Sequence, residues 1–306
     1  MKKVGNNPHV FNSISELHKE LALTKPKHPL ISVINFEEIK CFDNDSLSRV
    51  SYEFYCIALK KNFEGKMKYG QQYYDFDEGV MTFFSPMQVV TTEIVEGLKL
   101  KGYWLVVHPT FLVGYSLMKS IKDYGFFSYS VNEALHLSEQ EEEIIENIFK
   151  NIEREYQSNI DQFSQSVIIA QIELLLQYCN RFYNRQFITR KIYNDEILIR
   201  LENILSSYFN DEKEIGTKTP SVKYVSEQLN LSANYLSDML RSITGQTTQQ
   251  HIHNKLIEKA KELLTSTNLT ISEIAFQLGF VHPQSFNKLF KKKTDVTPME
   301  FRKSFN

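Results

Sequence analysis

The sequence predicts an α+β protein, in which an antiparallel β-barrel with appended helices precedes an all-helical module. Three observations lead to this prediction. Residues 29–107 consist of short apolar runs separated by turn signals, without a helical pattern. Residues 138–209 carry apolar side chains at helical spacing, and residues 220–306 repeat one two-helix pattern.

Length and composition favour a soluble, cytoplasmic protein of two domains. The chain has 306 residues and a mean hydropathy of -0.34. No apolar run is long enough to span a membrane, and residues 1–13 lack the apolar segment of a secretory signal. Cys41, Cys56 and Cys179 are widely spaced and odd in number, so we expect free thiols in a reducing compartment.

The charge is divided between an acidic body and a basic C-terminal part. Residues 216–306 hold 12 Lys and Arg against 7 Asp and Glu, a balance of +5. Because the whole chain has a formal charge of -2, residues 1–215 carry -7. A polyanion is therefore expected to meet only the C-terminal part.

Residues 1–28 are expected to form an arm or a short helix, and the residues that follow form a small barrel. Alternating or aromatic-rich runs separated by turn signals, with no helix between them, favour this antiparallel arrangement. The expected strands are 30–35, 50–59, 67–76, 80–84, 88–95 and 98–107. Residues 109–123 are then expected to be helical and residues 126–137 extended.

Helices are expected to follow the barrel. Ser138 and Glu141 have the spacing of a capping box, which begins a helix that ends near Tyr156. A second helix, from about 160 to 184, carries a dense apolar set: Phe163, Val167, Ile168, Ile172, Leu175, Leu176 and Cys179. A helix this apolar must be buried on more than one side. It could pack only on the barrel and the neighbouring helix, or it could also contact a second copy of the chain in a dimer.

The predicted organisation has four parts. A third helix over 194–209 ends the helical region, and the charged, turn-rich residues after it are typical of a linker. The parts are an arm and barrel in 1–137, a helical connector or dimerisation region in 138–209, a linker in 210–219 and a helical module in 220–306.

Residues 270–302 have the features of a helix-turn-helix. Thr270 and Glu273 form a capping box, and Gly279 ends the helix where a left-handed residue is needed. The expected inner residues are Ile271, Ile274, Ala275 and Leu278 in the first helix, and Phe286, Leu289 and Phe290 in the second. Pro298 is expected to begin a final short helix.

Residues 221–245 repeat this arrangement. The equivalent inner residues are Val222, Val225, Ser226 and Leu229, then Tyr235, Leu236, Met239 and Leu240. Ser232 is the expected N-cap of the second helix, and Gly245 ends it. Residues 248–264 form an amphipathic spacer helix about 25 Å long. This length suits two readers held near one DNA turn apart, about 34 Å, so that one chain enters two successive major grooves.

Residues 220–304 resemble the DNA-binding domain of the AraC/XylS family of bacterial transcription regulators. The matching residues are Leu231-Ser232, Tyr235-Leu236, Gly245, Lys255, Ala260, Leu263-Leu264, Ile274-Ala275, Gly279-Phe280, Phe286, Leu289-Phe290-Lys291, Thr297-Pro298 and Phe301-Arg302. The family usually has Gly where Asp295 stands and Tyr where Ser285 stands. Asp tolerates the left-handed conformation, so the turn should survive; Ser285 bears on base preference.

The resemblance implies a sequence-specific, dimeric DNA-binding regulator, by family analogy an activator that works with RNA polymerase at promoter DNA. The second helix of each helix-turn-helix would enter a major groove. The DNA-contacting residues would be Asn234, Ser237, Asp238, Arg241, Gln284, Ser285, Lys288, Lys291 and Lys292. Asn reads adenine and Asp accepts from cytosine. In the second unit Gln284, Ser285 and Lys288 would reach base edges, and Lys291 and Lys292 suit phosphates. Phosphates would repel Asp238 unless it finds a cytosine or pairs with Arg241.

The N-terminal region more loosely resembles the cupin-like sensor of that family, through its element order and through Phe84-Ser85-Pro86 and His108-Pro109. Two functions stay open for it: binding a small effector, or dimerisation without a ligand. An effector in an aromatic cavity would contact Tyr52, Phe54, Tyr69, Tyr73, Phe83 and Trp104. A metal-dependent cupin enzyme is not expected, because residues 29–107 contain no histidine.

No catalytic residue, cofactor or metal site is expected, and the chain is not expected to be an enzyme. It has no phosphate-cradling glycine loop, nucleophile elbow or zinc-binding spacing. His251 and His253 lie two apart on the spacer helix and point to different sides, so we interpret them as packing or surface residues.

Overall fold

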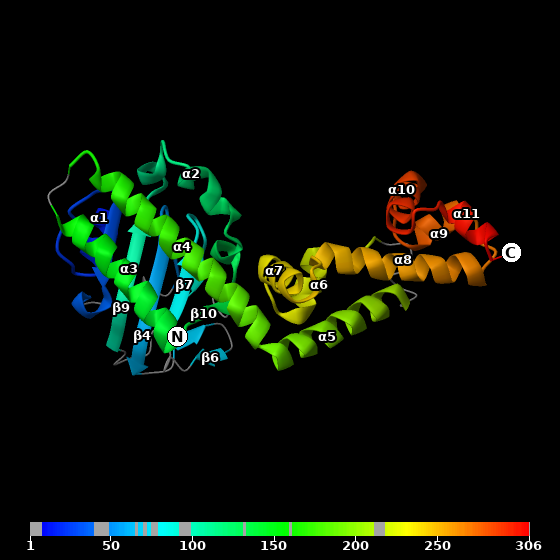
Figure 1. Cartoon of the computed structure of the whole chain (residues 1–306), viewed down its shortest axis with the longest axis horizontal. Helices are drawn as coiled ribbons and strands as arrows, with labels where there is room; N and C mark the ends of the chain where they lie inside the picture. The colour runs from blue at the N-terminus through cyan, green and yellow to red at the C-terminus, as the bar shows by residue number, and fades with distance from the viewer. Residues whose placement is uncertain are drawn as a thin grey trace. The chain divides into compact units, whose positions relative to one another are not determined.

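The chain divides into an N-terminal unit, residues 1–186, and a C-terminal unit, residues 187–306. The computed structural model describes residues 8–39, 49–64, 67–69, 72–74, 79–91, 99–130, 133–158, 161–210 and 218–305 (Figure 1). All the described strands belong to the N-terminal unit, and the described elements of the C-terminal unit are helices. The chain is therefore a unit of strands and helices followed by an all-helical unit, in agreement with the predicted α+β class.

A five-stranded antiparallel sheet forms the centre of the N-terminal unit. Its strands lie in the order β10 (Leu135–His136), β7 (Val80–Phe84), β4 (Tyr55–Glu64), β9 (Lys99–Val107) and β2 (Ile31–Asn35). Ala58 of β4 pairs with Thr82 on one side and Trp104 on the other. Directly paired residues point to the same side, so these three side chains share one face of the sheet.

Two smaller sheets accompany it. β1 (His9–Phe11) pairs in parallel with β3 (Arg49–Tyr52), which pairs antiparallel with β8 (Val90–Thr91). The third sheet is the hairpin of β5 (Met67–Tyr69) and β6 (Gln72–Tyr74).

The closed antiparallel barrel expected from the sequence is not what the structure contains in the residues that it describes. The sheets are separate, and the pair of β1 and β3 is parallel. The expected strand 50–59 is interrupted at Glu53 and Phe54, because its two halves belong to different sheets. Phe54 is fully buried at this corner, and its apolar ring explains why the sequence pattern looks continuous there.

An apolar core lies between the five-stranded and the three-stranded sheets. It joins Ala58 and Trp104 of the larger sheet to Phe11 and Tyr52 of the smaller one. α1 (Ile14–Glu20) adds buried apolar side chains at one side, and the short helix η1 (Phe36–Glu38) packs Phe36 on Trp104, with ring centroids 6.1 Å apart. The short helix expected near the start of the chain is thus present as α1.

Short helices connect β9 to β10. They are η3 (Pro109–Leu112), α2 (Leu117–Ser120), η4 (Ile121–Asp123) and η5 (Gly125–Ser128). The helical prediction for 109–123 is confirmed in broken form. The prediction of an extended segment over 126–137 is wrong at its beginning, because η5 buries Phe126 and Phe127 against Phe83 of β7. Burial of these rings decides the backbone conformation there.

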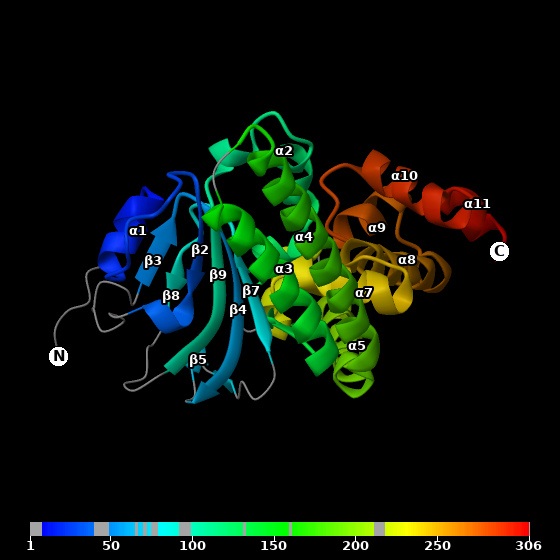
Figure 2. The same cartoon turned by 60° about the vertical axis from the view of Figure 1, so that its left-hand side comes forward.

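α3 (Glu139–Gln157) and α4 (Ser164–Thr189) both lie in front of the sheet in Figure 1, and Figure 2 shows them from a second side. The capping box of Ser138 and Glu141 begins α3, as predicted. Phe149 of α3 stacks on Tyr103 of β9, with centroids 5.6 Å apart. The helix is also tied to β4 by Lys61, whose ammonium lies 2.8 Å from the Glu142 carboxylate and pairs with Glu146.

The apolar residues of α4 and of its approach fall into two sets. Five of the seven predicted residues are buried: Ile168, Ile172, Leu175, Leu176 and Cys179. Phe163, Val167 and Leu174 are exposed, at 61%, 41% and 44% of their surface. The five buried residues therefore pack within the N-terminal unit, as predicted. The dimer contact remains a prediction, and the three exposed residues could form it.

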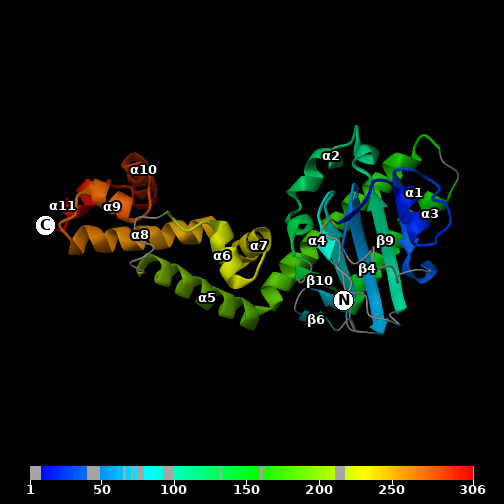
Figure 3. The ribbon, with the colours of Figure 1, turned by 180° about the vertical axis from the view of Figure 1, so that it is seen from behind.

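The C-terminal unit is built on one central helix. Its described helices are α5 (Lys191–Asn210), α6 (Val222–Leu229), α7 (Ala233–Thr244), α8 (Thr248–Ser266), α9 (Ile271–Gln277), α10 (Pro283–Thr294) and α11 (Pro298–Lys303). Figure 3 shows α6 and α7 near one end of α8, and α9 to α11 near the other. α5 packs on α6 and α8, so it joins this unit. The structure divides the chain into two units, 1–186 and 187–306. The four predicted parts, 1–137, 138–209, 210–219 and 220–306, remain predictions.

Candidate nucleic-acid interface

The first helix-turn-helix consists of α6 and α7, and side-chain caps define both helices. The Ser221 hydroxyl accepts a hydrogen bond from the Tyr224 amide, and the Ser232 hydroxyl accepts one from the Tyr235 amide. α6 ends at Asn230 with φ 57°, a left-handed conformation that Asn tolerates. α7 ends at Gly245 with φ 72°. The predicted N-cap and C-terminal glycine of α7 are therefore confirmed.

The second helix-turn-helix consists of α9 and α10. The Thr270 and Glu273 capping box begins α9, and Asp295 ends α10 with φ 64°. The turn therefore survives the replacement of glycine by Asp295, as predicted. Gly279 has φ 84°, and a Cβ there would collide with the backbone of Lys218 and Thr219. Glycine is needed at 279 for two reasons, its positive φ and this close approach.

Both helix-turn-helices pack against α8. Its buried residues are Thr248, Ile252, Leu256, Ile257, Ala260, Leu263 and Leu264. One apolar core joins residues 256–264 of α8 to the second helix-turn-helix. It contains Phe286 and Phe290 of α10, Ile274 and Ala275 of α9, and Phe209 of α5. α8 has 19 residues, about 28 Å at 1.5 Å per residue. Because both helix-turn-helices pack on the single helix α8, the distance between them is set within the C-terminal unit.

In the first helix-turn-helix, three of the four candidate DNA contacts, Ser237, Asp238 and Arg241, are engaged with the protein itself. The Ser237 hydroxyl shares a hydrogen bond of 3.0 Å with the Thr248 hydroxyl. The Arg241 guanidinium donates to Asp238 over 3.1 Å, the pairing required if Asp238 is to approach DNA. Asn234 and Arg241 are exposed on α7. Ser237 is therefore better placed to orient α7 on α8 than to read a base.

In the second helix-turn-helix, all five candidate side chains are exposed on α10: Gln284, Ser285, Lys288, Lys291 and Lys292. None of them makes a side-chain hydrogen bond or ion pair to the residues that the structure describes. Lys293 instead donates to the Asn254 amide oxygen of α8 over 2.8 Å. The free donors and acceptors of α10 are thus available to a ligand.

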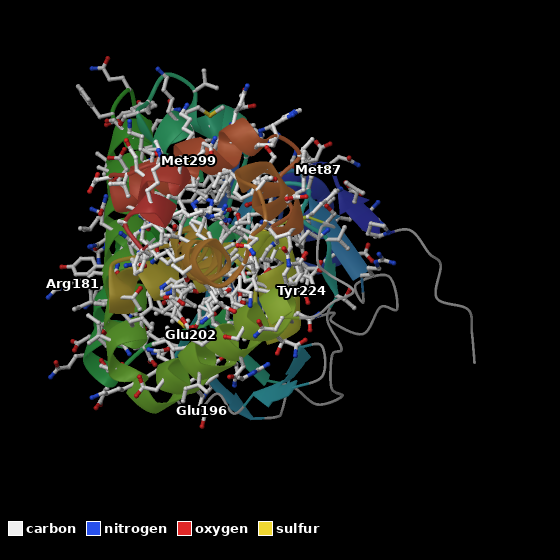
Figure 4. All side chains as sticks on the ribbon, turned by 90° about the vertical axis from the view of Figure 1, so that its right-hand side faces the viewer. Met87, Arg181, Glu196, Glu202, Tyr224 and Met299 are labelled. Carbon is white, nitrogen blue, oxygen red and sulfur yellow. The ribbon has the colours of Figure 1, made fainter. Side chains whose placement is uncertain are left out.

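Further residues on α10 and α5 contribute to the helix-turn-helix surface and its support. Asn287 is exposed on α10, three residues after Gln284 and four before Lys291, so helical spacing alone places it on their face. α5 holds the first helix-turn-helix: the Arg200 guanidinium donates to the Gln228 carbonyl over 3.4 Å. Glu202 of α5, labelled in Figure 4, lies 3.7 Å from the Lys255 ammonium of α8. The contacts of Arg200 with Gln228 and of Glu202 with Lys255 could not be predicted from local sequence patterns.

The candidate effector residues do not gather at one place. Tyr52, Phe54 and Trp104 are buried together, with the ring centroids of Tyr52 and Trp104 5.7 Å apart. Phe83 lies on the other face of the sheet, because it pairs with Ile57 and packs on Phe126. Its interpretation as a neighbour of Trp104 is therefore not supported. Tyr69 and Tyr73 belong to β5 and β6, whose side chains lie outside the described residues.

The side chains of His251, Cys56 and Cys179 are hydrogen-bonded or buried within the protein. The His251 ring shares a hydrogen bond of 3.0 Å with the Thr244 hydroxyl, and burial lowers its pKa. Burial also raises the pKa of the thiols of Cys56 and Cys179, which are free and buried. Cys41 lies outside the described residues. Within the described ranges no cluster of His, Cys, Asp or Glu has the arrangement of a metal site, and no helix could cross a membrane.

Comparison with known proteins places the similarity in the C-terminal unit. A family described as "Helix-turn-helix domain" matches residues 225–304. The chain is 37% identical over 81 residues to the xylose operon regulatory protein of Escherichia coli (strain K12), an alignment that covers 26% of this chain and 21% of that protein. It is 34% identical over 83 residues to an uncharacterized HTH-type transcriptional regulator, YisR, of Bacillus subtilis (strain 168), covering 27% and 29%.

Among solved structures, the C-terminal domain of the two-component response regulator yesN from Fusobacterium nucleatum is 35% identical. The match covers 33% of this chain and 93% of that domain, with a TM-score of 0.29. The chain spans only 21% and 29% of the two curated relatives named above. The matched family covers the helix-turn-helix module of this chain.

Proposed function

Because the C-terminal module of this chain is a DNA-binding domain of the AraC/XylS family, we propose that the protein is a sequence-specific transcription regulator. The observation that carries the proposal is the pair of helix-turn-helices packed on one helix, α8. A single short recognition helix reads few base pairs, and two on a rigid spacer read successive major grooves of one duplex. The protein acts on chromosomal DNA in the cytoplasm.

The two recognition helices divide the work unequally. α10 presents Lys291 and Lys292 with no internal partner among the described residues, so they neutralise phosphates and supply most of the salt-dependent affinity. Lys288 of the same helix reaches base edges. α7 presents Asn234 and the paired Asp238 and Arg241, which suit base edges. Base preference then depends more on α7, and affinity more on α10.

Dimerisation uses the exposed apolar residues at the start of α4. Phe163, Val167 and Leu174 are separated by four and seven residues, which places them along one side of the helix. Apolar groups in such a row lose water when a second copy covers them. Two chains would bring two C-terminal units to one promoter, and the expected homodimer follows from this contact.

Oligomeric state tests the dimer. Val167→Asp and Leu174→Asp place charges in the contact, so we expect a shift from dimer to monomer in sedimentation velocity. Asn180→Asp, at an exposed position further along the same helix, is the matched control and leaves the dimer intact. Dimers of unchanged strength in both apolar variants would remove α4 from the contact.

A small effector modulates the protein, with the N-terminal unit as its cupin-like sensor, and activation with RNA polymerase follows by family analogy. The order of elements, strands followed by helices, supports the sensor assignment. Effector binding shifts the population of chains whose C-terminal units fit two half-sites. The alternative is a constitutive dimeric regulator without a ligand.

DNA binding by the full-length chain is the central test. We expect specific duplex binding whose affinity falls steeply with salt, because several lysines displace counterions from phosphates. Lys291→Ala and Asn234→Ala separate the two contributions: the first reduces the salt slope, and the second relaxes base preference. A salt response that is flat, with equal binding to all sequences, would contradict the proposed function.

A further inference from the structure

A cavity of about 290 Å³ opens in the N-terminal unit where α3 ends and α4 begins. It lies outside the aromatic core formed by Tyr52, Phe54 and Trp104. Its walls come from the turn before β2, from η3, from the last turn of α3 and from the first turns of α4. Its volume is at the lower end of the range for small-molecule sites, about 300–1,000 Å³.

Hydrogen bonds hold the walls of this cavity in place. The Tyr156 hydroxyl of α3 accepts from the Lys27 amide over 2.7 Å, which joins α3 to the turn before β2. The Gln165 side-chain amide of α4 donates to the Phe111 carbonyl of η3 over 2.7 Å. Three regions distant in sequence, namely the turn before β2, η3 and the junction of α3 with α4, are therefore fixed around the space, so the cavity is formed before a ligand arrives.

The charge at the cavity is negative. Glu155 and Asp161 line it, whereas no Lys or Arg does so in the part of the chain that the structure describes. The Glu155 carboxylate makes no hydrogen bond or ion pair with described residues. Asp161 caps α4 by accepting from the amides of Phe163 and Ser164, and these hydrogen bonds hold its pKa below the usual range. The first amides of α4 are thus already satisfied by an anion, which disfavours an anionic ligand.

The remaining lining is neutral. Burial lowers the pKa of His28, and its Nδ1 accepts from the Leu30 amide over 3.1 Å, so the ring adds no positive charge near neutral pH. The ring of Phe111 meets that of His28 edge to face, with centroids 5.4 Å apart. Together with Ile168 these rings offer an apolar surface beside the carboxylates. Such a lining suits a cation with an apolar body.

We propose that this cavity binds a small organic amine, whose ammonium is attracted by Glu155 and Asp161 and whose apolar body packs on Phe111 and Ile168. The free oxygens of the two carboxylates accept its N–H groups, and charge-assisted hydrogen bonds of this kind are stronger than neutral ones. Only the regulatory meaning of this site rests on the proposed function. α4 begins at the cavity and carries Val167 and Leu174, so a ligand bound there contacts the same helix that bears the proposed dimer contact.

Calorimetric titration of the full-length chain tests the site. The probes are phenethylamine, benzylamine and putrescine, each beside its uncharged alcohol, with phenylacetate as the anion. We expect each amine to bind more tightly than its alcohol, and phenylacetate to bind least. Glu155→Gln keeps the shape of the side chain and should weaken amine binding roughly tenfold, equivalent to about 1.4 kcal/mol. Glu143→Gln, on the exposed face of α3, is the matched control and leaves the affinity unchanged.

The outcomes separate this site from the proposed function. Amines that bind no better than their alcohols, or an affinity that Glu155→Gln leaves unchanged, overturn the proposal. Because titration needs no DNA, amine binding by a chain that fails to bind DNA upholds the cavity and counts against the regulator. Amine binding that changes the affinity for DNA or the strength of the dimer upholds both.

Discussion

Gly279, in the turn of the second helix-turn-helix, lies against the backbone of Lys218 and Thr219 at the beginning of the helical module. Its replacement by alanine should destabilise that module. Its φ of 84° costs a residue with a Cβ about 1–2 kcal/mol. The new Cβ would also lie 2.6 Å from the Thr219 amide nitrogen and in collision with the Lys218 carbonyl carbon. Overpacking of this kind costs about 1–3 kcal/mol. The expected loss is therefore about 2–5 kcal/mol.

Gly245 supplies the control, because it has the same kind of backbone without the close approach. Its φ is 72°, and a Cβ there meets no atom within 4 Å. Gly245→Ala should therefore cost only the conformational part, about 1–2 kcal/mol. The difference between the two variants, about 1–3 kcal/mol, measures the contact with Lys218 and Thr219.

Hydrogen exchange in the full-length chain can measure both losses. We expect amides of α9 and α10 to exchange roughly thirty- to several-thousand-fold faster in Gly279→Ala, since 1.4 kcal/mol is tenfold. Urea unfolding followed by Trp104, the only tryptophan, reports the N-terminal unit and should not change. Equal exchange in the two glycine variants would refute the argument, because the approach to 218–219 would then have no energetic consequence.

Three further predictions follow from the same structure. Lys288→Ala should weaken specific DNA binding roughly fivefold to hundredfold while melting is unchanged, with Lys223→Ala as an exposed control; unaltered affinity and specificity would exclude Lys288 from the interface. Arg302→Ala should destabilise the C-terminal unit without changing the salt slope of DNA binding, because its Nε donates to the Leu264 carbonyl over 3.1 Å; a changed slope would reassign it to DNA. Burial lowers the pKa of Lys60 from 10.5 to about 7, so between these pH values the unfolded chain binds the extra proton and stability of the N-terminal unit rises with pH. Lys60→Met should abolish that rise in urea unfolding followed by Trp104, and a wild-type stability that falls over this window would contradict the assignment.

The helix ends of this protein follow from neighbouring residues. Ser138 with Glu141, Thr270 with Glu273, and Ser232 act as the expected caps. A cap needs only a side-chain oxygen and an amide two or three residues away, so sequence contains all of its parts. The same holds for the left-handed turn at Asp295, which depends on one residue and its short polar side chain.

Sheet partners could not be derived in this way. Residues 50–59 look like one strand because apolar residues continue through Phe54, but β3 and β4 pair with different neighbours. Phe83 looks like a companion of Trp104 because both are aromatic strand residues, but pairing register puts them on opposite faces. A shift of one residue reverses every side chain of a strand, so the faces depend on partners far away in the chain.

By itself the sequence determined the doubled helix-turn-helix, its spacer and the outer residues of α10, because helical periodicity and caps act over a few residues. It also predicted the pairing that Asp238 needs, and Arg241 provides it three residues later. Only the tertiary structure decided that Ser237 binds Thr248 of α8, that Gly279 touches residues 218–219, and that His28, Phe111, Glu155 and Asp161 surround one cavity. These arrangements join segments up to more than a hundred residues apart, and packing of the whole unit, rather than any local preference, brings such segments together.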